Sequence, residues 1–485
     1  AWGGPMDLCD SETTWLLDFE FKAAKSHLPV YDSVWAEPDH GQLTKLLREV
    51  VGTRVIDRRE RAKKLKARVD KQSRWSNVMN RHVDFATKLS ATEHIRPRIG
   101  WVSTFGERCG VATYTEALVG HLRAPPSVVF ARQGIGIDVS KTAESSDTVV
   151  VPSWDDNGFG GIVEAVRLHH LSAIVVQFAY PFYDYDALAE LVAELSDLGC
   201  VLILELHESE PPTYEKSKHL KNLYNTLLLF DRILVHSVSA INDLKAVGIT
   251  ESVTLFPHGV KVLSKEKTRA PPAQITQRIA EARQEKSMQV IGSFGFFLPH
   301  KGFADLIQIV EQLCAKGMSL HLLLMTAEYP APVSRLAIEE AERLIDQLGL
   351  RNNVTLMTDY LADEEVHAAL KLCDLLVFPY RYTEQGASGA VRYGLSCDVP
   401  VVTSDLDFFD ELGDCVRKLR IRDHEEMTLD LEASLIAVRE KSPEIVSQLE
   451  CARDWVRNHS YGILARRLYG MITGLSRLKR RKSYD

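Results

Sequence analysis

The chain reads Gly292-Ser-Phe-Gly295-Phe-Phe-Leu-Pro-His300-Lys301-Gly302 and, about ninety residues later, Pro379-Tyr-Arg-Tyr-Thr-Glu384-Gln385-Gly386-Ala-Ser388-Gly389-Ala390-Val-Arg392-Tyr393-Gly394. Each segment has the pattern of an apolar strand, a loop of small residues and a helix. The first N–H groups of such a helix and its dipole both favour an anion, so phosphate is attracted there. Two such loops on one strand–helix series predict a domain that binds a diphosphate.

The sequence on either side of these loops also alternates between strands and helices. Apolar runs predict strands at 98–103, 127–130, 148–151, 173–177, 201–206, 232–236 and 252–255, and again at 288–292, 320–325, 354–357, 375–379, 399–403 and 416–419. Continuous apolar runs are typical of parallel strands that are buried on both faces. We therefore predict an α/β fold with two Rossmann-like, doubly wound domains that face a cleft.

The domain boundaries follow from the same pattern. The segment 261–286 contains Pro271 and Pro272 among many charges, and we predict that it links the two domains and enters the first helix of the second. The predicted domains are 97–265 and 266–455, followed by a C-terminal helix and basic tail at 456–485.

Residues 1–96 do not fit this alternation, because they are charged and predicted to be helical at 42–51 and 58–89. They are similar to the C-terminus of the same chain: Asp39-His40-Gly-Gln-Leu43 parallels Asp423-His424-Glu-Glu-Met427. The stretch from Ala67-Arg68 through Trp75 to Arg81 likewise parallels the stretch from Ala452-Arg453 through Tyr461 to Arg467. One interpretation is an internal repeat, with 1–96 as the tail of an upstream copy of the domain. The alternative is chance similarity between two amphipathic helical stretches.

Composition limits the class of protein. The chain has 485 residues, of which 45% are hydrophobic and 26% charged, as in ordinary globular domains. The formal net charge of −8 argues against a broad electrostatic surface for nucleic acid. The basic stretch from Arg477 to Lys482 is either a solvated tail or a weak contact with anionic lipid.

The cysteines and apolar runs indicate a cytoplasmic protein. None of the eight cysteines forms a C-x-x-C pair, which favours reduced thiols over a disulfide framework or a zinc site. No apolar run reaches the roughly 18 residues that a membrane span needs, and no signal peptide is evident. Because the sequence begins at Ala1 rather than Met, we expect a fragment or a processed product.

Three further motifs precede the opening pair: Thr104-Phe-Gly106-Glu107-Arg108-Cys109-Gly110-Val111-Ala112-Thr-Tyr114, Leu206-His207-Glu208 and Phe256-Pro-His258-Gly259-Val260. In this order and spacing, the motifs resemble retaining nucleotide-sugar glycosyltransferases of the GT-B fold, family 4 or group 1. The resemblance covers 97 to about 480. The segment Ser33-Val-Trp35-Ala-Glu37-Pro38-Asp39 also resembles the tail of such an enzyme.

The resemblance implies a donor site in the second domain. Lys301 would neutralise charge on the leaving nucleoside diphosphate, and the amides of Ser388, Gly389 and Ala390 would bind its oxygens. Glu384 would contact the donor sugar. The implied donor-binding set is Gly295, Lys301, Gly302, Glu384, Ser388, Gly389, Ala390 and Arg392.

The chain departs from the family pattern at two positions. Phe296 stands where the family usually has an arginine, so one of two expected cations is absent or supplied elsewhere. The family also has a second glutamate eight residues after the first, for the ribose hydroxyls. Here that position is Arg392, or Tyr393 in the register counted back from Pro400, so the ribose carboxylate is missing in both registers.

In the first domain, the resemblance implies that the loop with Gly106, Glu107, Arg108 and Gly110 covers the acceptor and the diphosphate. Glu107 and Arg108 could instead be solvated loop charges. His207 would lie near the transferred sugar, the alternative being an ordinary buried histidine. The implied catalytic set is Lys301, Glu384 and His207.

The implied reaction transfers a hexose from a nucleotide sugar, such as a GDP- or UDP-hexose, with retention at the anomeric carbon. No carboxylate pair suggests double displacement, so we expect same-face attack, with no metal and no cofactor. The expected setting is a bacterial multidomain enzyme of surface polysaccharide or glycoconjugate synthesis. Its acceptor would be a glycan, a lipid-linked glycan or a protein. The reaction would take place in the cytoplasm or at the inner face of the plasma membrane. The expected partner is a covalently linked upstream glycosyltransferase domain.

Two other functions stay open. A non-catalytic glycosyltransferase-like domain would bind glycan or stabilise a partner, and the departures at Phe296 and at Arg392 or Tyr393 favour it. A GT-B epimerase or hydrolase would act on a nucleotide sugar. A nicotinamide dehydrogenase is disfavoured, because Gly134-Ile-Gly136 lacks the third glycine and the following helix of that motif.

Overall fold

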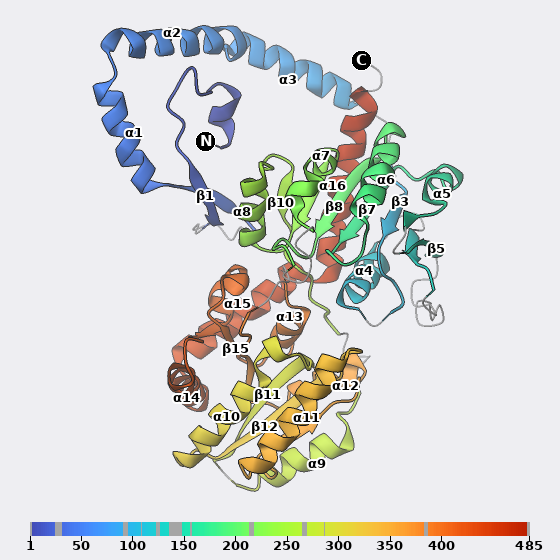
Figure 1. Cartoon of the computed structure of the whole chain (residues 1–485), viewed down its shortest axis with the longest axis vertical. Coiled ribbons are helices and arrows are strands. Elements are labelled where there is room, and N and C mark those ends of the chain that lie inside the picture. Colours follow the sequence, from blue (N-terminus) through green and yellow to red (C-terminus); the bar gives the residue numbers. More distant parts are fainter. Residues whose placement is uncertain are drawn as a thin grey trace. The chain divides into compact units, whose positions relative to one another are not determined.

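The computed structural model describes residues 2–24, 32–90, 96–107, 109–122, 127–134, 148–155, 158–212, 218–263, 269–285, 287–382 and 387–482, with the backbone alone at 85–90 and 480–482. The chain forms two compact units (Figure 1). One comprises 98–471, and the other comprises 1–97 together with 472–485.

The unit 98–471 begins with a domain built on an eight-stranded sheet in the order β10-β9-β8-β7-β3-β4-β5-β6. Every neighbouring pair is parallel except β5 with β6. The strands are β3 (Ile99–Val102), β4 (Val128–Arg132), β5 (Val149–Asp155), β6 (Gly158–Phe159), β7 (Ala173–Phe178), β8 (Val201–Leu206), β9 (Arg232–Val235) and β10 (Val253–Leu255). The helices are α4 (Gly110–His121), α5 (Ile162–Leu168), α6 (Tyr185–Asp197), α7 (Tyr224–Leu227) and α8 (Val238–Val247).

The second domain of this unit has a six-stranded, fully parallel sheet in the order β13-β12-β11-β14-β15-β16. Its strands are β11 (Gln289–Phe296), β12 (Leu320–Ala327), β13 (Val354–Met357), β14 (Leu375–Phe378), β15 (Val401–Ser404) and β16 (Arg417–Leu419). Its helices are α9 (Ala273–Ala282), α10 (Phe303–Ala315), α11 (Pro332–Gln347), α12 (Asp363–Leu370), α13 (Gly389–Leu395), α14 (His424–Glu440) and α15 (Pro443–His459). The last helix, α16 (Tyr461–Lys482), begins after the chain has returned to the first domain, where the Tyr461 ring stacks on His121 of α4. Short 3-10 segments are η4 (Pro299–Lys301) and η5 (Asp407–Cys415).

The apolar runs form the strands for a simple reason. All six residues of β7 and all six of β8 are buried, because helices cover both faces of a parallel sheet. The prediction of two doubly wound α/β domains is therefore confirmed. One boundary was wrong: β11 continues to Phe296, four residues beyond the predicted end, because it pairs with β12 as far as Ala327. Half of the segment predicted to be a loop is thus strand.

Each sheet has one place where the order of its strands reverses. In the first sheet this place lies between β3 and β7, and in the second it lies between β11 and β14. Loops that leave adjacent parallel strands in opposite directions open a crevice at their carboxyl ends, where ligands bind in such folds. The quoted segment 292–302 contains the end of β11 and the loop after it, and the segment 379–394 follows β14, so both lie at this crevice.

The chain passes between the two α/β domains twice, and the two crossings are hydrogen-bonded to each other. Val260 forms a parallel bridge with Ser460, with Val260 N–H donating to His459 O over 2.9 Å. A side chain at Gly259 could not fit here, because a Cβ would lie 2.4 Å from the Tyr461 ring. The motif at 256–260 is thus part of the connection between the domains.

The other unit contains a hairpin and three helices. Strand β1 (Phe19–Ala23) pairs antiparallel with β2 (Val34–Pro38), and the Phe19 and Phe21 rings are buried against each other. The helices are α1 (His40–Gly52), α2 (Val55–Gln72) and α3 (Trp75–Ser90). The predicted helix at 58–89 is two helices, because α2 ends at a C-cap on Ser73. The hairpin was not predicted.

The eight cysteines are free thiols in the structure. Within the ranges that the structure describes, no helix is both long and apolar enough to cross a bilayer.

We predict that Gly302→Ala destabilises the second domain far more than Gly317→Ala. Both glycines have a left-handed backbone, with φ of 72° and 90°, which costs alanine about 1–2 kcal/mol. A Cβ on Gly302 would also lie 1.9 Å from Pro379 O, whereas nothing lies within 4 Å of one on Gly317. Urea unfolding should show that Gly302→Ala lowers the free energy of unfolding by at least about 2 kcal/mol more than the control Gly317→Ala does. Equal losses would contradict the close approach.

Candidate active site

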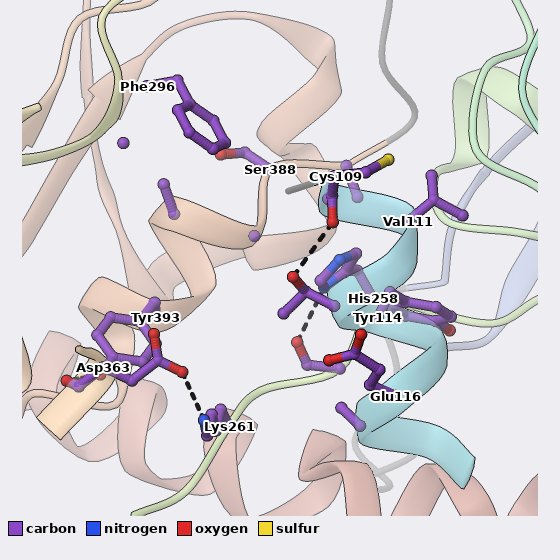
Figure 2. Close-up of a pocket in the computed structure, with 18 of the residues that line it drawn as sticks. Cys109, Val111, Tyr114, Glu116, His258, Lys261, Phe296, Asp363, Ser388 and Tyr393 are labelled. Atoms are coloured by element: carbon purple, nitrogen blue, oxygen red, sulfur yellow. Dashed lines mark hydrogen bonds and ion pairs between the residues drawn. The ribbon is translucent and has the colours of Figure 1, made fainter. Parts of the chain in front are cut away.

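A cavity of about 910 Å³ lies within the unit 98–471 and is lined by both of its α/β domains (Figure 2). The first domain contributes the loop after β3, α4 along its length and the residues after β7 and β8. The second contributes the end of β11, η4 and the start of α13. The lining residues named below are Cys109, Gly110, Tyr114, Glu116, His207, His258, Lys261, Gly295, Phe296, Lys301, Tyr329, Tyr360, Asp363, Ser388, Gly389, Ala390, Tyr393 and Tyr461.

Lys301 is the cation that the cavity presents from the second domain. It ends η4, is only 7% exposed, and its Nζ lies 3.8 Å from the centre of the Tyr380 ring. A cation held over a ring face is attracted by the ring quadrupole. Among the described residues, no carboxylate comes within ion-pair distance of Lys301. Its charge is therefore available to an anionic ligand.

Tyr380 joins the two segments that the sequence singled out. Its ring lies under Lys301, and its hydroxyl forms a hydrogen bond of 2.8 Å with Ser388 Oγ. Ser388 is the N-cap of α13 and its hydroxyl accepts from Val391 N–H. The next N–H groups, of Gly389 and Ala390, have no acceptor within a helix that begins here. Lys301 and these amides are thus held in one wall of the cavity.

The two glycines of the first segment have different positions. Gly295 lines the cavity with φ of 138°, and a Cβ there would meet the Ala390 side chain at 3.5 Å. Gly302 does not line it; it forms the turn between η4 and α10, packed against Pro379. Of the predicted donor residues, Gly295, Lys301, Ser388, Gly389 and Ala390 are therefore brought together.

Arg392 does not take the predicted place. It is fully buried outside the cavity lining, where its guanidinium donates to Ser388 O over 2.9 Å and pairs with Glu411. Burial lowers the pKa of Arg392 to about 10. Tyr393 lines the cavity instead and donates its hydroxyl to Asp363 O. Because a helix has about 3.6 residues per turn, neighbouring residues point to different sides. Tyr393 therefore faces the cavity, whereas Arg392 points into the core and holds Ser388 through its carbonyl.

Two predicted residues lie outside the described residues: Glu384, with its neighbours Gln385 and Gly386, and Arg108. In the same loop as Arg108, Gly106 has φ of 70° and donates its N–H to Glu116 over 2.8 Å. Glu107 is partly buried, and that burial raises its pKa. Neither Gly106 nor Glu107 lines the cavity, whereas Gly110 does.

His207 lines the cavity from the end of β8, and both of its ring nitrogens are engaged. Nε2 lies 2.6 Å from Gln177 Oε1, and Nδ1 lies 3.3 Å from Nε2 of His236. Nδ1 of His236 lies 2.9 Å from Phe256 O, so that nitrogen must carry a proton. His236 Nε2 then accepts from His207 Nδ1–H.

A buried carboxyl group closes the other end of this network. Glu205 accepts from the Tyr114 hydroxyl and, over 2.7 Å, from the Gln177 amide. Burial raises the pKa of Glu205 to about 7. Burial also lowers the pKa of His207 well below its ordinary value, and the adjacent His236 and His258 lower it further.

These pKa values favour a network without net charge. Neutral His207 with a proton on Nδ1 needs a donor at Nε2, and protonated Glu205 needs an acceptor. Turning the amide of Gln177, which exchanges its oxygen and nitrogen, supplies both. The Gln177 amide, placed between the two groups, thus links Glu205 to His207.

An aromatic group replaces the expected second cation. Phe296 contacts Tyr329, with ring centres 5.2 Å apart, and lies nearly parallel to Tyr360 at 6.2 Å. The other lysine of the lining, Lys261, is paired with Asp363 (Figure 2). Within the described part of the lining, Lys301 is therefore the one lysine or arginine without a carboxylate partner. In the described ranges, no cluster of His, Cys, Asp or Glu could hold a metal ion.

Sequence reasoning missed the supporting residues Tyr114, Gln177, Glu205 and His236. A usable signal was present: Gln177 and Glu205 are polar residues inside apolar runs that form buried strands. Buried polar groups need partners, so the pair could have pointed to a shared network. Tyr393 was named as the alternative to Arg392, whereas Asp363 gave no comparable signal.

Known proteins are similar to this chain in part of its sequence and in its fold. Residues 288–432 match the family model for Glycosyl transferases group 1. Solved structures of glycosyltransferases share the fold over both α/β domains. The chain has the GT-B fold, and its second α/β domain matches the glycosyltransferase family. No curated protein matches the sequence.

The structural neighbours match this chain over nearly their whole length. Anabaena Alr3699/HepE in complex with UDP has 14% identity and a TM-score of 0.61, with 78% of this chain and 100% of that chain covered. A glycosyltransferase from Rickettsia africae has 12% identity and a TM-score of 0.62, with 78% and 98% covered. The trehalose-6-phosphate synthase OtsA has 13% identity and a TM-score of 0.56, with 78% and 99% covered. At these identities the likeness shows the fold alone.

We predict that Glu205→Gln flattens the pH dependence of stability. Burial raises the pKa of Glu205 from 4.5 to about 7, so folding takes up a proton between these values. Stability should therefore fall as pH rises through this window, by up to about 1.4 kcal/mol per pH unit. Urea unfolding should show that the free energy of unfolding falls less between pH 5 and pH 7 in Glu205→Gln than in the wild type.

The control for this measurement is Glu194→Gln, which removes an exposed carboxylate from α6. It should follow the wild-type profile. A Glu205→Gln profile that is identical to wild type would show that Glu205 is ionised across the whole window.

Proposed function

We propose that the chain transfers a hexose from a nucleotide sugar to an acceptor hydroxyl with retention at the anomeric carbon. The observation that carries this proposal is one cavity with Lys301 and the amides at 388–390 on one wall and His207 on the other. The first wall suits a diphosphate by charge and by N–H donors. The second suits the sugar that the diphosphate carries.

The chemistry needs little covalent help from the protein. The bond from the anomeric carbon to the diphosphate oxygen breaks, and its electron pair leaves with the diphosphate. Lys301 and the amides of Gly389 and Ala390 stabilise this growing negative charge. The acceptor oxygen attacks the same face, and its proton passes to the departing phosphate oxygen. No metal and no cofactor take part in this proposal.

His207 has a positioning role in this scheme. Both ring nitrogens are used inside the buried network, so the side chain has no free nitrogen to take up the acceptor proton. Its low pKa keeps the ring neutral, which avoids repulsion with an oxocarbenium-like carbon. The ring edge then forms a fixed wall for the sugar.

A UDP-hexose is the donor we propose. The neighbour HepE has been solved with UDP and with UDP-glucose. Phe296, Tyr329 and Tyr360 offer this chain an aromatic surface on the donor side of the cavity. For the acceptor we propose a glycan, lipid-linked glycan or protein of a bacterial surface polysaccharide or glycoconjugate. The reaction would take place in the cytoplasm or at the inner face of the membrane.

A second function, nucleotide-sugar binding without transfer, has its own support. Phe296 occupies the place of an expected cation, and Tyr393 rather than a carboxylate faces the cavity. Tyr393 also uses its hydroxyl on Asp363 O. Such a site would hold a donor with weaker stabilisation of the leaving group.

We predict that UDP raises the melting temperature of the chain and that Lys301→Ala removes this effect. A ligand at 100 times its dissociation constant stabilises by about 2.7 kcal/mol, which thermal shift detects across a panel of UDP-, GDP- and ADP-sugars. The control is Lys316→Ala, because Lys316 pairs with Glu432 on the surface of the same domain. It should respond as wild type does. A panel without any response contradicts donor binding.

Transfer and binding are separated by product analysis with a labelled donor. The proposed enzyme moves the label to an acceptor with the anomeric configuration kept, and Lys301→Ala lowers the rate by about 10²–10³-fold. A chain that is stabilised by UDP-sugars but leaves the donor intact is the binding module. Free labelled hexose without an acceptor product would indicate a hydrolase.

A further inference from the structure

Helix α1 in the N-terminal unit repeats helix α14 of the second α/β domain in local detail. Each begins with an aspartate N-cap: Asp39 accepts from Gln42 N–H over 2.9 Å, and Asp423 accepts from Glu426 N–H over 2.8 Å. A histidine follows each cap. Five residues after the cap, a threonine hydroxyl donates to that histidine's carbonyl, at 3.1 Å in α1 and 2.6 Å in α14.

The apolar positions also correspond. The buried residues of α14 are Met427, Thr428, Leu431, Ser434 and Leu435. Counted from the caps, the same positions in α1 are Leu43, Thr44, Leu47, Val50 and Val51. Four of these five are apolar and one is the matching threonine. The two helices therefore have the same pattern of residues along one face.

This face is covered in α14 and largely uncovered in α1, where Leu43 and Val50 are half-buried and the other three positions are exposed. Leu431 and Leu435 pack into the core beside α10 and the second sheet and are 0% exposed. Their counterparts Leu47 and Val51 are 57% and 77% exposed, and α1 has no buried residue at all. An apolar stripe of this kind normally faces a core.

The correspondence continues into the following helices. α2 and α3 follow α1 as α15 and α16 follow α14. Trp75 begins α3 and is 81% exposed, whereas Tyr461 begins α16 and is buried. An aromatic residue thus begins both helices, and it is exposed in the N-terminal unit but buried at the start of α16.

We propose that α1 to α3 form the C-terminal helices of a second donor-type α/β domain and that their exposed face docks on its core. In the second domain, β11 to β16 precede α14 in the chain. A domain of the same order would precede α1 in the polypeptide. This interface is separate from the transfer reaction, so it holds whichever function the cavity has.

The polar residues of the stripe distinguish this occupant from a membrane. In α14, His424 Nε2 lies 2.8 Å from Asp305 Oδ1, and the Thr428 hydroxyl lies 2.8 Å from Gln312 Oε1. Asp305 and Gln312 belong to α10, the helix that packs beside α14. α1 keeps both residues, as His40 and Thr44, and both are exposed. A lipid surface needs neither, whereas an α10-like helix bonds to both.

A helix graft in the full chain tests whether α1 fits such a core. Residues 40–51 replace residues 424–435, so that His40 and Thr44 take the places of His424 and Thr428. The expected result is a cooperatively folded chain with the melting temperature lowered by roughly 5–10 °C. The loss reflects surface ion pairs of α14, such as Lys316 with Glu432, that the graft does not reproduce.

The control graft places residues 57–68 of α2 at the same positions. It is equally long and helical, but it puts Glu60, Arg61, Lys64 and Arg68 at four of the five buried places. Cooperative unfolding of the second domain should be lost. Both grafts failing alike would overturn the proposal, and so would both succeeding. The readout is unfolding followed by circular dichroism, which needs no activity.

Point variants test the exposed face of α1 in the intact chain. Leu47→Lys should leave the melting temperature within about 1 °C of wild type, because the residue is exposed, whereas Leu431→Lys should unfold the second domain. Light scattering should give the mass of one chain, and vesicles of phosphatidylcholine and phosphatidylserine should not retain the protein. A dimer, or vesicle binding, that Leu47→Lys abolishes would assign the face to another occupant and overturn the proposal.

Discussion

The ring of Tyr380 is the contact on which the arrangement of the cavity depends. One face carries the ammonium group of Lys301, and the hydroxyl at its edge bonds to Ser388. The loops after β11 and β14 are thereby fixed to each other. The tight turn at Gly302, which fits against Pro379 only without a side chain, brings Lys301 to this ring. A diphosphate would meet a wall that is formed before it arrives, and that lowers the cost of ordering on binding.

The opposite wall is ordered by a different constraint, the need of buried polar groups for partners. Glu205 and Gln177 lie on neighbouring strands, and each would be costly alone in an apolar sheet. Tyr114 and His207 satisfy them, and His236 connects the group to the backbone at Phe256. The position of His207 in the cavity thus depends on residues that never touch a ligand. Replacing any of them would shift this wall.

The sequence predicted the two doubly wound domains because parallel strands must be apolar on both faces. It also predicted which loops meet, since loops after β11 and β14 leave the same edge of one sheet. It could not decide between Arg392 and Tyr393, because one residue of helical register turns a side chain from the cavity to the core. The hairpin at 19–38 was missed, since its alternation is weak and its partners are local. The Glu205 network depends on which strands become neighbours, and a linear sequence does not state that.

The paired crossings at Val260 and Ser460 have a mechanical consequence for the enzyme. Two connections joined by hydrogen bonds form a single stiff hinge, whereas one connection would let the domains swivel. Tyr461 packs against Gly259 and meets the rings of Tyr114 and His258 edge to face, so it fills the space beside this hinge. A hinge of this kind would restrict relative motion to opening and closing about one axis. Release of a nucleotide product would be timed by that single motion, in which the wall with Lys301 moves away from His207.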